Sequence, residues 1–177
     1  GVRWYLTGHA PWSNGYEAIV FISWISVLAG LLLYKNRNAF IPTTGAMVAV
    51  IMMGFAHGGS MLDPQITPLV PVLKSYWLIV HVAIIVSSYG FFGLSAILGV
   101  FSLIIMMIKP NKKIEISLKE MTYVSEMSLT IGIYLLAVGT FLGGMWANES
   151  WGRYWSWDPK ETWAFVSVIV YAVVLHM

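Results

Sequence analysis

The segment from Trp146 to Trp163 holds the side chains of this sequence that are best suited to binding a large flat ligand. Five of its eighteen residues are Trp, and charged residues of both signs lie between them. Indole rings offer flat apolar surface, while the charges can meet polar groups at the rim of an amphiphilic ring system. An aromatic belt at a lipid–water interface needs the rings but not this density of charge. Two interpretations therefore stand: a binding platform, or an interfacial belt with a charged rim.

A porphyrin is the ligand that this mixture of side chains fits. The Trp rings would cover the macrocycle, Arg153 and Lys160 would neutralise its propionate carboxylates, and Asn148 would donate a hydrogen bond. The predicted binding residues are Trp146, Asn148, Trp151, Arg153, Trp155, Trp157, Lys160 and Trp163.

The end of this segment also has the pattern of a helix start. Asp158 is a predicted N-cap, Pro159 the first helical residue, and Glu161 the acid that reaches back. Such a cap would hold the preceding rings rigidly, so a structural role does not exclude a chemical one. We predict that Asp158 and His81 are the catalytic residues.

Histidines supply the candidate iron ligands, because imidazole is the usual axial ligand of haem. His81 lies near the outward start of an apolar stretch, level with the Trp-rich segment. His176 follows Asp158 by eighteen residues, or about 27 Å of helix, so it lies near the opposite membrane edge. Two depths suggest two sites and a transported ligand, whereas an ordinary interfacial or packing histidine is the alternative for each. His9 and His57 are rivals of His81 on the outward side.

The elements that position these residues are predicted to be membrane helices. The chain is 58% hydrophobic and 10% charged, whereas soluble domains carry about 25% charged residues. Because backbone groups in lipid must be satisfied internally, we expect one all-α membrane domain over 1–177, with about five transmembrane helices. The expected spans are Glu17–Tyr34, Ala39–His57, Tyr76–Ile108, Met121–Met145 and Thr162–Met177.

Basic residues give the orientation. Six of the ten lie in two turns on the side read as cytoplasmic, and they are Lys35, Arg37, Lys109, Lys112, Lys113 and Lys119. The Trp-rich segment then faces outward, and the basic turns are not patterned for nucleic acid. With no Cys, the chain offers no thiol of its own. Both ends look cut, so we expect a fragment of a longer polypeptide.

The run Trp151–Trp163 closely resembles the signature of the WWD family of haem-handling membrane proteins, and within it the CcsA proteins of system II cytochrome c biogenesis. Gly8–Glu17, Pro68–Pro71 and Trp77–Val82 are similar to the same family. The resemblance suggests the C-terminal part of a CcsBA-type fusion.

The resemblance implies a function. Haem b would be exported and attached to apocytochrome c as a holocytochrome c synthase does, through thioether bonds to a Cys-x-x-Cys-His segment. It makes His81 an outward axial ligand of haem iron and ties His176 to haem access from the inner side. The implied partners are CcsB or the CcsB part of the same polypeptide, apocytochrome c, a thiol-reducing protein and the lipid bilayer.

The implied location is the bacterial inner membrane, with residues 146–163 as a periplasmic haem-binding segment. Two alternatives stay open. One is a haem exporter or chaperone without ligation chemistry, and the other is a haem- or quinone-binding electron-transfer subunit.

Overall fold

Helices form every regular element in the part of the chain that the structure describes. The structure is a computed structural model, and it describes residues 2–8, 10, 12, 14–34, 38–58, 62, 64–65, 75–108 and 112–177. The helices are α1 (Val2–Thr7), α2 (Gly15–Leu32), α3 (Phe40–Gly58), α4 (Tyr76–Met107), α5 (Lys112–Trp151) and α6 (Pro159–His176). Among the residues discussed above, His9, Pro68, Pro71, Lys35, Arg37 and Lys109 lie outside the described residues.

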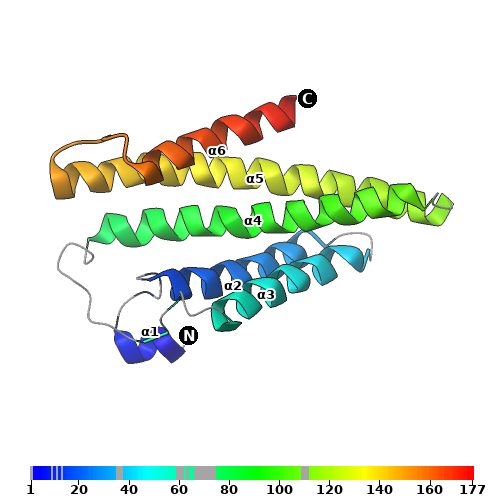
Figure 1. Cartoon of the computed structure of the whole chain (residues 1–177), viewed down its shortest axis with the longest axis horizontal. Helices are drawn as coiled ribbons and strands as arrows, with labels where there is room; N and C mark the ends of the chain where they lie inside the picture. The colour runs from blue at the N-terminus through cyan, green and yellow to red at the C-terminus, as the bar shows by residue number, and fades with distance from the viewer. Residues whose placement is uncertain are drawn as a thin grey trace.

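The helices are stacked in layers. Figure 1 shows α5 between α6 and α4, with α2 and α3 on the far side of α4. Four helices, α2 to α5, are long and apolar enough to cross a membrane, which confirms a multi-pass membrane protein. The fifth predicted span is helical as α6 but is not among these four, since Lys160, Glu161 and His176 lower the hydropathy of its 18 residues.

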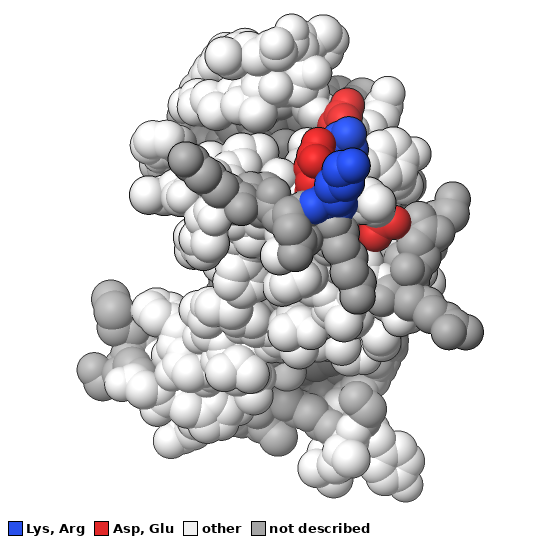
Figure 2. All heavy atoms as spheres, turned by 90° about the vertical axis from the view of Figure 1, so that its right-hand side faces the viewer, with Lys and Arg blue, Asp and Glu red and all other residues white. Residues whose placement is uncertain are grey.

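The ends of α5 differ from the prediction. The sequence predicts a span over Met121–Met145 between two loops, but α5 has 40 residues, about 60 Å, and includes Lys112–Glu120 and Trp146–Trp151. The first part contains neither Gly nor Pro, so nothing in it interrupts a helix. Figure 2 shows basic and acidic side chains side by side at this end, where Nζ of Lys119 lies 3.8 Å from Oε1 of Glu115.

A buried asparagine just before α3 ties that helix to this extension of α5. Nδ2 of Asn38 donates hydrogen bonds to the Ser117 carbonyl at 3.2 Å and to Oε2 of Glu120 at 3.1 Å. Asn38, which lies just before α3, is therefore held against α5 on the side away from the Trp-rich segment.

The α4–α5 interface positions the candidate site. Four buried polar residues of α4, spaced seven apart, follow one face of the helix: His81, Ser88, Ser95 and Ser102. A seven-residue repeat is the spacing of a left-handed helix pair, and small residues let the two backbones approach closely. The hydroxyls of Ser95 and Ser125 of α5 lie 2.8 Å apart across this interface. His81 is the outermost member of the row, so its side chain is directed toward α5.

Candidate functional site

His81 lies in the second turn of α4 and is only 8% exposed. Its Nδ1 lies 2.8 Å from the carbonyl oxygen of Trp77. A carbonyl can only accept, so Nδ1 carries the proton and a neutral ring keeps its lone pair on Nε2. Metal-binding histidines use the same arrangement, in which a second group orients the ring. The local geometry of His81 therefore suits an axial ligand.

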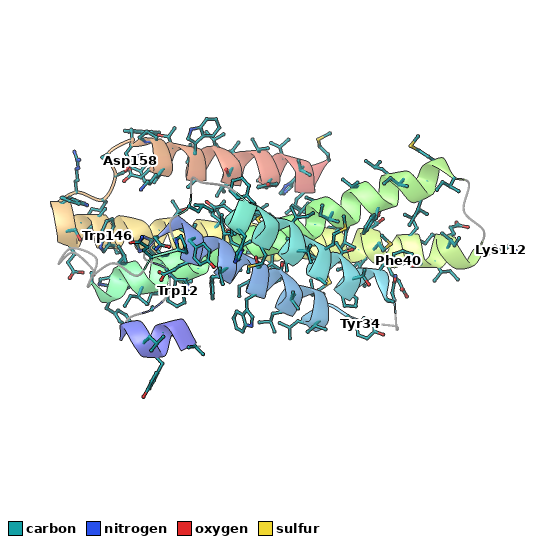
Figure 3. All side chains as sticks on the ribbon, turned by 60° about the horizontal axis from the view of Figure 1, so that its bottom comes forward. Trp12, Tyr34, Phe40, Lys112, Trp146 and Asp158 are labelled. Carbon is teal, nitrogen blue, oxygen red and sulfur yellow. The ribbon has the colours of Figure 1, made fainter. Side chains whose placement is uncertain are left out.

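Trp146 covers this imidazole from α5. The two rings are stacked, with centroids 5.5 Å apart and planes 29° from parallel. Trp151 meets Trp146 edge-on, with centroids 6.4 Å apart, and completes a small cluster at the outer end of α4 and α5. Figure 3 shows Trp146 at the same end of the bundle as Asp158. The structure thus brings His81 to the level of the Trp-rich segment.

The remaining indoles form a second group. Trp155 and Trp157 lie edge-to-face at 5.7 Å, and each approaches Phe165 of α6 within 6.5 Å. Trp157 has a φ of 58°, a left-handed conformation that is uncommon for a residue with a side chain. Trp163 is 69% exposed and belongs to neither group.

The segment between α5 and α6 folds back along α5, as Figure 1 shows. A methyl group on Gly144 would lie 3.1 Å from the Tyr154 carbonyl oxygen, so the absence of a side chain there permits this close approach. A cavity of about 450 Å³ lies between α5, this segment and α6, and its almost wholly apolar lining includes Phe141, Trp155 and Phe165. His81 is not part of that lining.

The polar residues predicted for the site lie at its edge. Arg153 and Lys160 are exposed, so both can reach carboxylates of a ligand that rests on the segment. The main-chain carbonyl oxygen of Asn148 accepts a hydrogen bond from Gly152 N at 2.9 Å. This bond closes the last turn of α5. The φ of 71° at Gly152 favours glycine there.

Asp158 caps α6 as the sequence predicts. Its side chain accepts a hydrogen bond from Glu161 N at 2.9 Å, and Oε2 of Glu161 accepts one from Ser156 N at 2.7 Å. Pro159 is the first helical residue. The two carboxylates therefore join the start of α6 to the segment that carries Trp155 and Trp157.

Replacing Asp158 with Ala should lower the stability of α6 by about 1 kcal/mol, because the Glu161 N–H loses its acceptor. Asp158→Asn keeps an acceptor oxygen at this position and is the matched control. Thermal unfolding of the detergent-purified protein measures the difference. An Asp158→Ala melting temperature equal to that of Asp158→Asn would contradict the capping role.

His176 lies far from His81 in depth. Tyr171 of α6 stacks on Phe92 of α4 with ring centroids 4.2 Å apart. Phe92 is eleven residues beyond His81, and His176 is five residues beyond Tyr171 on a helix that runs in the same direction. The helical rise therefore separates the two histidines by about 24 Å along the bundle. They do not form one metal site.

His176 and His57 each have a ring nitrogen close to a backbone carbonyl, as His81 does. Nδ1 of His176 lies 2.7 Å from the Ala172 carbonyl oxygen, and Nδ1 of His57 lies 3.0 Å from that of Met53. Both rings are exposed and, like His81, leave Nε2 with the lone pair. No group of three or more metal-ligating side chains occurs among the described residues.

Sequence reasoning missed two contributors to the site. The first is Gly143, where a methyl group would lie 3.3 Å from Cδ2 of His81. The second is the Trp77 carbonyl that orients the ring. The spacing could have found both, because Trp77 precedes His81 by one helical turn and Gly143 precedes Trp146 by nearly one.

Comparison with known proteins gives one consistent result. The family model described as cytochrome C assembly protein matches residues 12–177. Protein NrfI of Wolinella succinogenes is 47% identical over 99% of this chain, and CcsA of Buxus microphylla is 33% identical over 98%. CcsA of Chlamydomonas reinhardtii is 35% identical over 99%. The chain spans 20%, 67% and 52% of these three proteins, respectively.

Proposed function

This chain belongs to the cytochrome c assembly protein family, and on that premise we propose that it binds haem at the outer face of the membrane and presents it for covalent attachment to apocytochrome c. Haem is the substrate in this proposal. The observation that carries it is the pairing of His81, with its lone pair on Nε2, and Trp146 of the Trp-rich segment.

Haem binding requires a change at this pair. His81 is 8% exposed and Trp146 covers its ring, so a macrocycle can reach Nε2 only if Trp146 moves off the ring or the α4–α5 contact opens. The indole N–H of Trp146 is buried and has no hydrogen-bond partner among the described residues. Its movement therefore breaks no hydrogen bond within the described part of the chain.

The other residues of the segment hold the macrocycle. The indoles and the apolar cavity beside Trp155 offer flat and concave apolar surface to the porphyrin. Arg153 and Lys160 neutralise propionates at the exposed edge. Asp158 contributes by fixing the segment to α6, which makes it a positioning residue rather than a group that moves protons.

Attachment then consists of two additions. Each cysteine thiol of the apocytochrome adds its sulfur to one carbon of a haem vinyl group and its proton to the other, so no oxidant is needed. The protein accelerates this step by positioning, which can lower a barrier by several kcal/mol when the reacting atoms are aligned. The cysteines must be reduced, so the proposal includes a thiol-reducing partner.

The proposal also places the protein in a route across the membrane. His176 serves haem on the inner side, and the Trp-rich segment faces the periplasm of a bacterial cytoplasmic membrane. The depth difference of about 24 Å between His176 and His81 supports two stations. CcsB, or a CcsB part of the same polypeptide, supplies the remaining helices and ligands.

Co-expression of the complete protein with an apocytochrome c tests the proposal in cells that have no cytochrome c maturation system of their own. We expect haem that stays bound to the cytochrome after denaturation and acid extraction, with the mass of a bis-thioether adduct. A cytochrome whose Cys-x-x-Cys-His cysteines are replaced by Ser is the control. A haem-loaded membrane protein beside a cytochrome without covalent haem would instead identify a haem exporter.

A further inference from the structure

Gly143 is the glycine of α5 that faces His81. A methyl group on Gly143 would lie 3.3 Å from Cδ2 and 3.8 Å from Nε2 of that ring. A contact of 3.3 Å is shorter than nine in ten real Cβ contacts, so the ring or the helix would have to shift. The absent side chain thus leaves room beside the imidazole on the α5 face that also carries Trp146.

The imidazole has little freedom to yield. Its Nδ1 is held by the Trp77 carbonyl at 2.8 Å, and Trp146 stacks on the ring at 5.5 Å. A side chain at position 143 would push the ring away from the Trp77 carbonyl, or push α5 and Trp146 away from α4. Either change moves Nε2 relative to the Trp-rich segment.

The other glycines of α5 have different neighbours. A methyl group on Gly132 would meet the ring of Phe92, and one on Gly139 would lie 2.5 Å from Cγ1 of Ile85. Gly144 faces the Tyr154 backbone. Those three sites serve packing of apolar side chains or backbone, and Gly143 alone among the four contacts a ring that can bind metal.

We propose that Gly143 is a positioning residue that holds Nε2 of His81 where haem iron can bond to it once Trp146 has moved from the ring. The inference rests on the proposed function, in which His81 is an iron ligand. In addition, α5 helps to position the iron ligand by having no side chain at position 143. Any side chain there would shift the His81 ring.

The test uses the complete protein, purified in detergent with the haem it retains, and absorption spectroscopy of that haem. Gly143→Ala should lower the low-spin haem content, and Gly143→Val should lower it by at least about tenfold, since a change in the groups that orient a metal ligand costs roughly 10–100-fold in affinity. Gly99→Ala of α4 is the matched control, because a methyl group there has no neighbour within 4 Å among the described residues. It should keep the wild-type spectrum.

Imidazole added to a His81→Gly background separates positioning from packing. Free imidazole has no tether and can shift by a few tenths of an ångström, so Gly143→Ala should not reduce the imidazole-rescued spectrum in that background. An equal loss in both backgrounds would overturn the inference, as would a wild-type spectrum for Gly143→Val. Failure of Gly143→Ala to fold in both backgrounds would likewise show a packing role.

The same series distinguishes failure of the proposed function. If His81→Gly without imidazole retained the wild-type haem spectrum, His81 would not be an iron ligand, and Gly143 could not act through it. If His81→Gly lost that spectrum while Gly143→Val kept it, the result would support His81 as an iron ligand and contradict only the positioning role of Gly143.

Discussion

His81→Ala should remove low-spin haem from the outer site and stop covalent attachment to apocytochrome c. The loss in haem affinity should exceed the roughly 10–100-fold that removal of an outer-shell partner of a metal ligand costs, because the ligand itself is lost. Absorption spectra of the purified complete protein measure the haem, and acid-stable haem on the cytochrome measures the attachment.

His57→Ala is the matched control for this prediction. His57 also ends a helical turn with Nδ1 bound to a backbone carbonyl, but it is exposed and its ring contacts Tyr16 rather than an indole of the Trp-rich segment. Its replacement should leave haem content and attachment near wild type. Full attachment in the His81→Ala protein without added imidazole would contradict the assignment of His81.

His176→Ala should reduce haem loading of the outer site by about tenfold or more, a change worth at least about 1.4 kcal/mol. The residue lies about 24 Å deeper than His81 along the bundle, so its loss cannot act on the outer iron by direct contact. The measurement is the haem-to-protein ratio of the purified complete protein.

Haemin added from outside, in detergent, provides the control for this second prediction. It bypasses the inner station, so His176→Ala protein should then reach the wild-type haem content, whereas His81→Ala protein should not. An unchanged haem content in His176→Ala protein as isolated from cells would contradict a role of this histidine in haem access from the inner side.

The local parts of the site could be predicted from the sequence. The Asp158 cap and Pro159 at the first position of α6 depend on neighbouring residues only, and both are confirmed. Glu161 also reaches back, but to Ser156 N rather than to the N–H of the cap residue. The level of His81 with the Trp-rich segment follows from helical rise, and its stacking on Trp146 agrees with that.

The division of the indoles could not be predicted. It depends on the path of the segment between α5 and α6, which is set by a left-handed Trp157, by Gly152 and by the close approach of Tyr154 to Gly144. These are tertiary contacts and backbone angles that composition and spacing do not determine. The sequence therefore predicts one binding platform of five indoles, where the structure has two groups and an exposed Trp163.

The ends of α5 could not be predicted either, for a second reason. Lys112–Glu120 holds three Lys and two Glu among its nine residues, so its charge predicts part of a basic loop, although Lys, Glu and Leu are good helix formers. Asn38, which comes from a distant turn, binds this helix through Ser117 and Glu120. Hydropathy locates the portion of a helix within lipid but does not show where the helix ends.

A density map of the haem-loaded complete protein would show whether His81 binds the iron. We expect haem iron bonded to Nε2 of His81, Nδ1 still bound to the Trp77 carbonyl, and Trp146 moved from the imidazole face to the porphyrin. Haem bound elsewhere, with His81 still stacked beneath Trp146, would contradict this expectation.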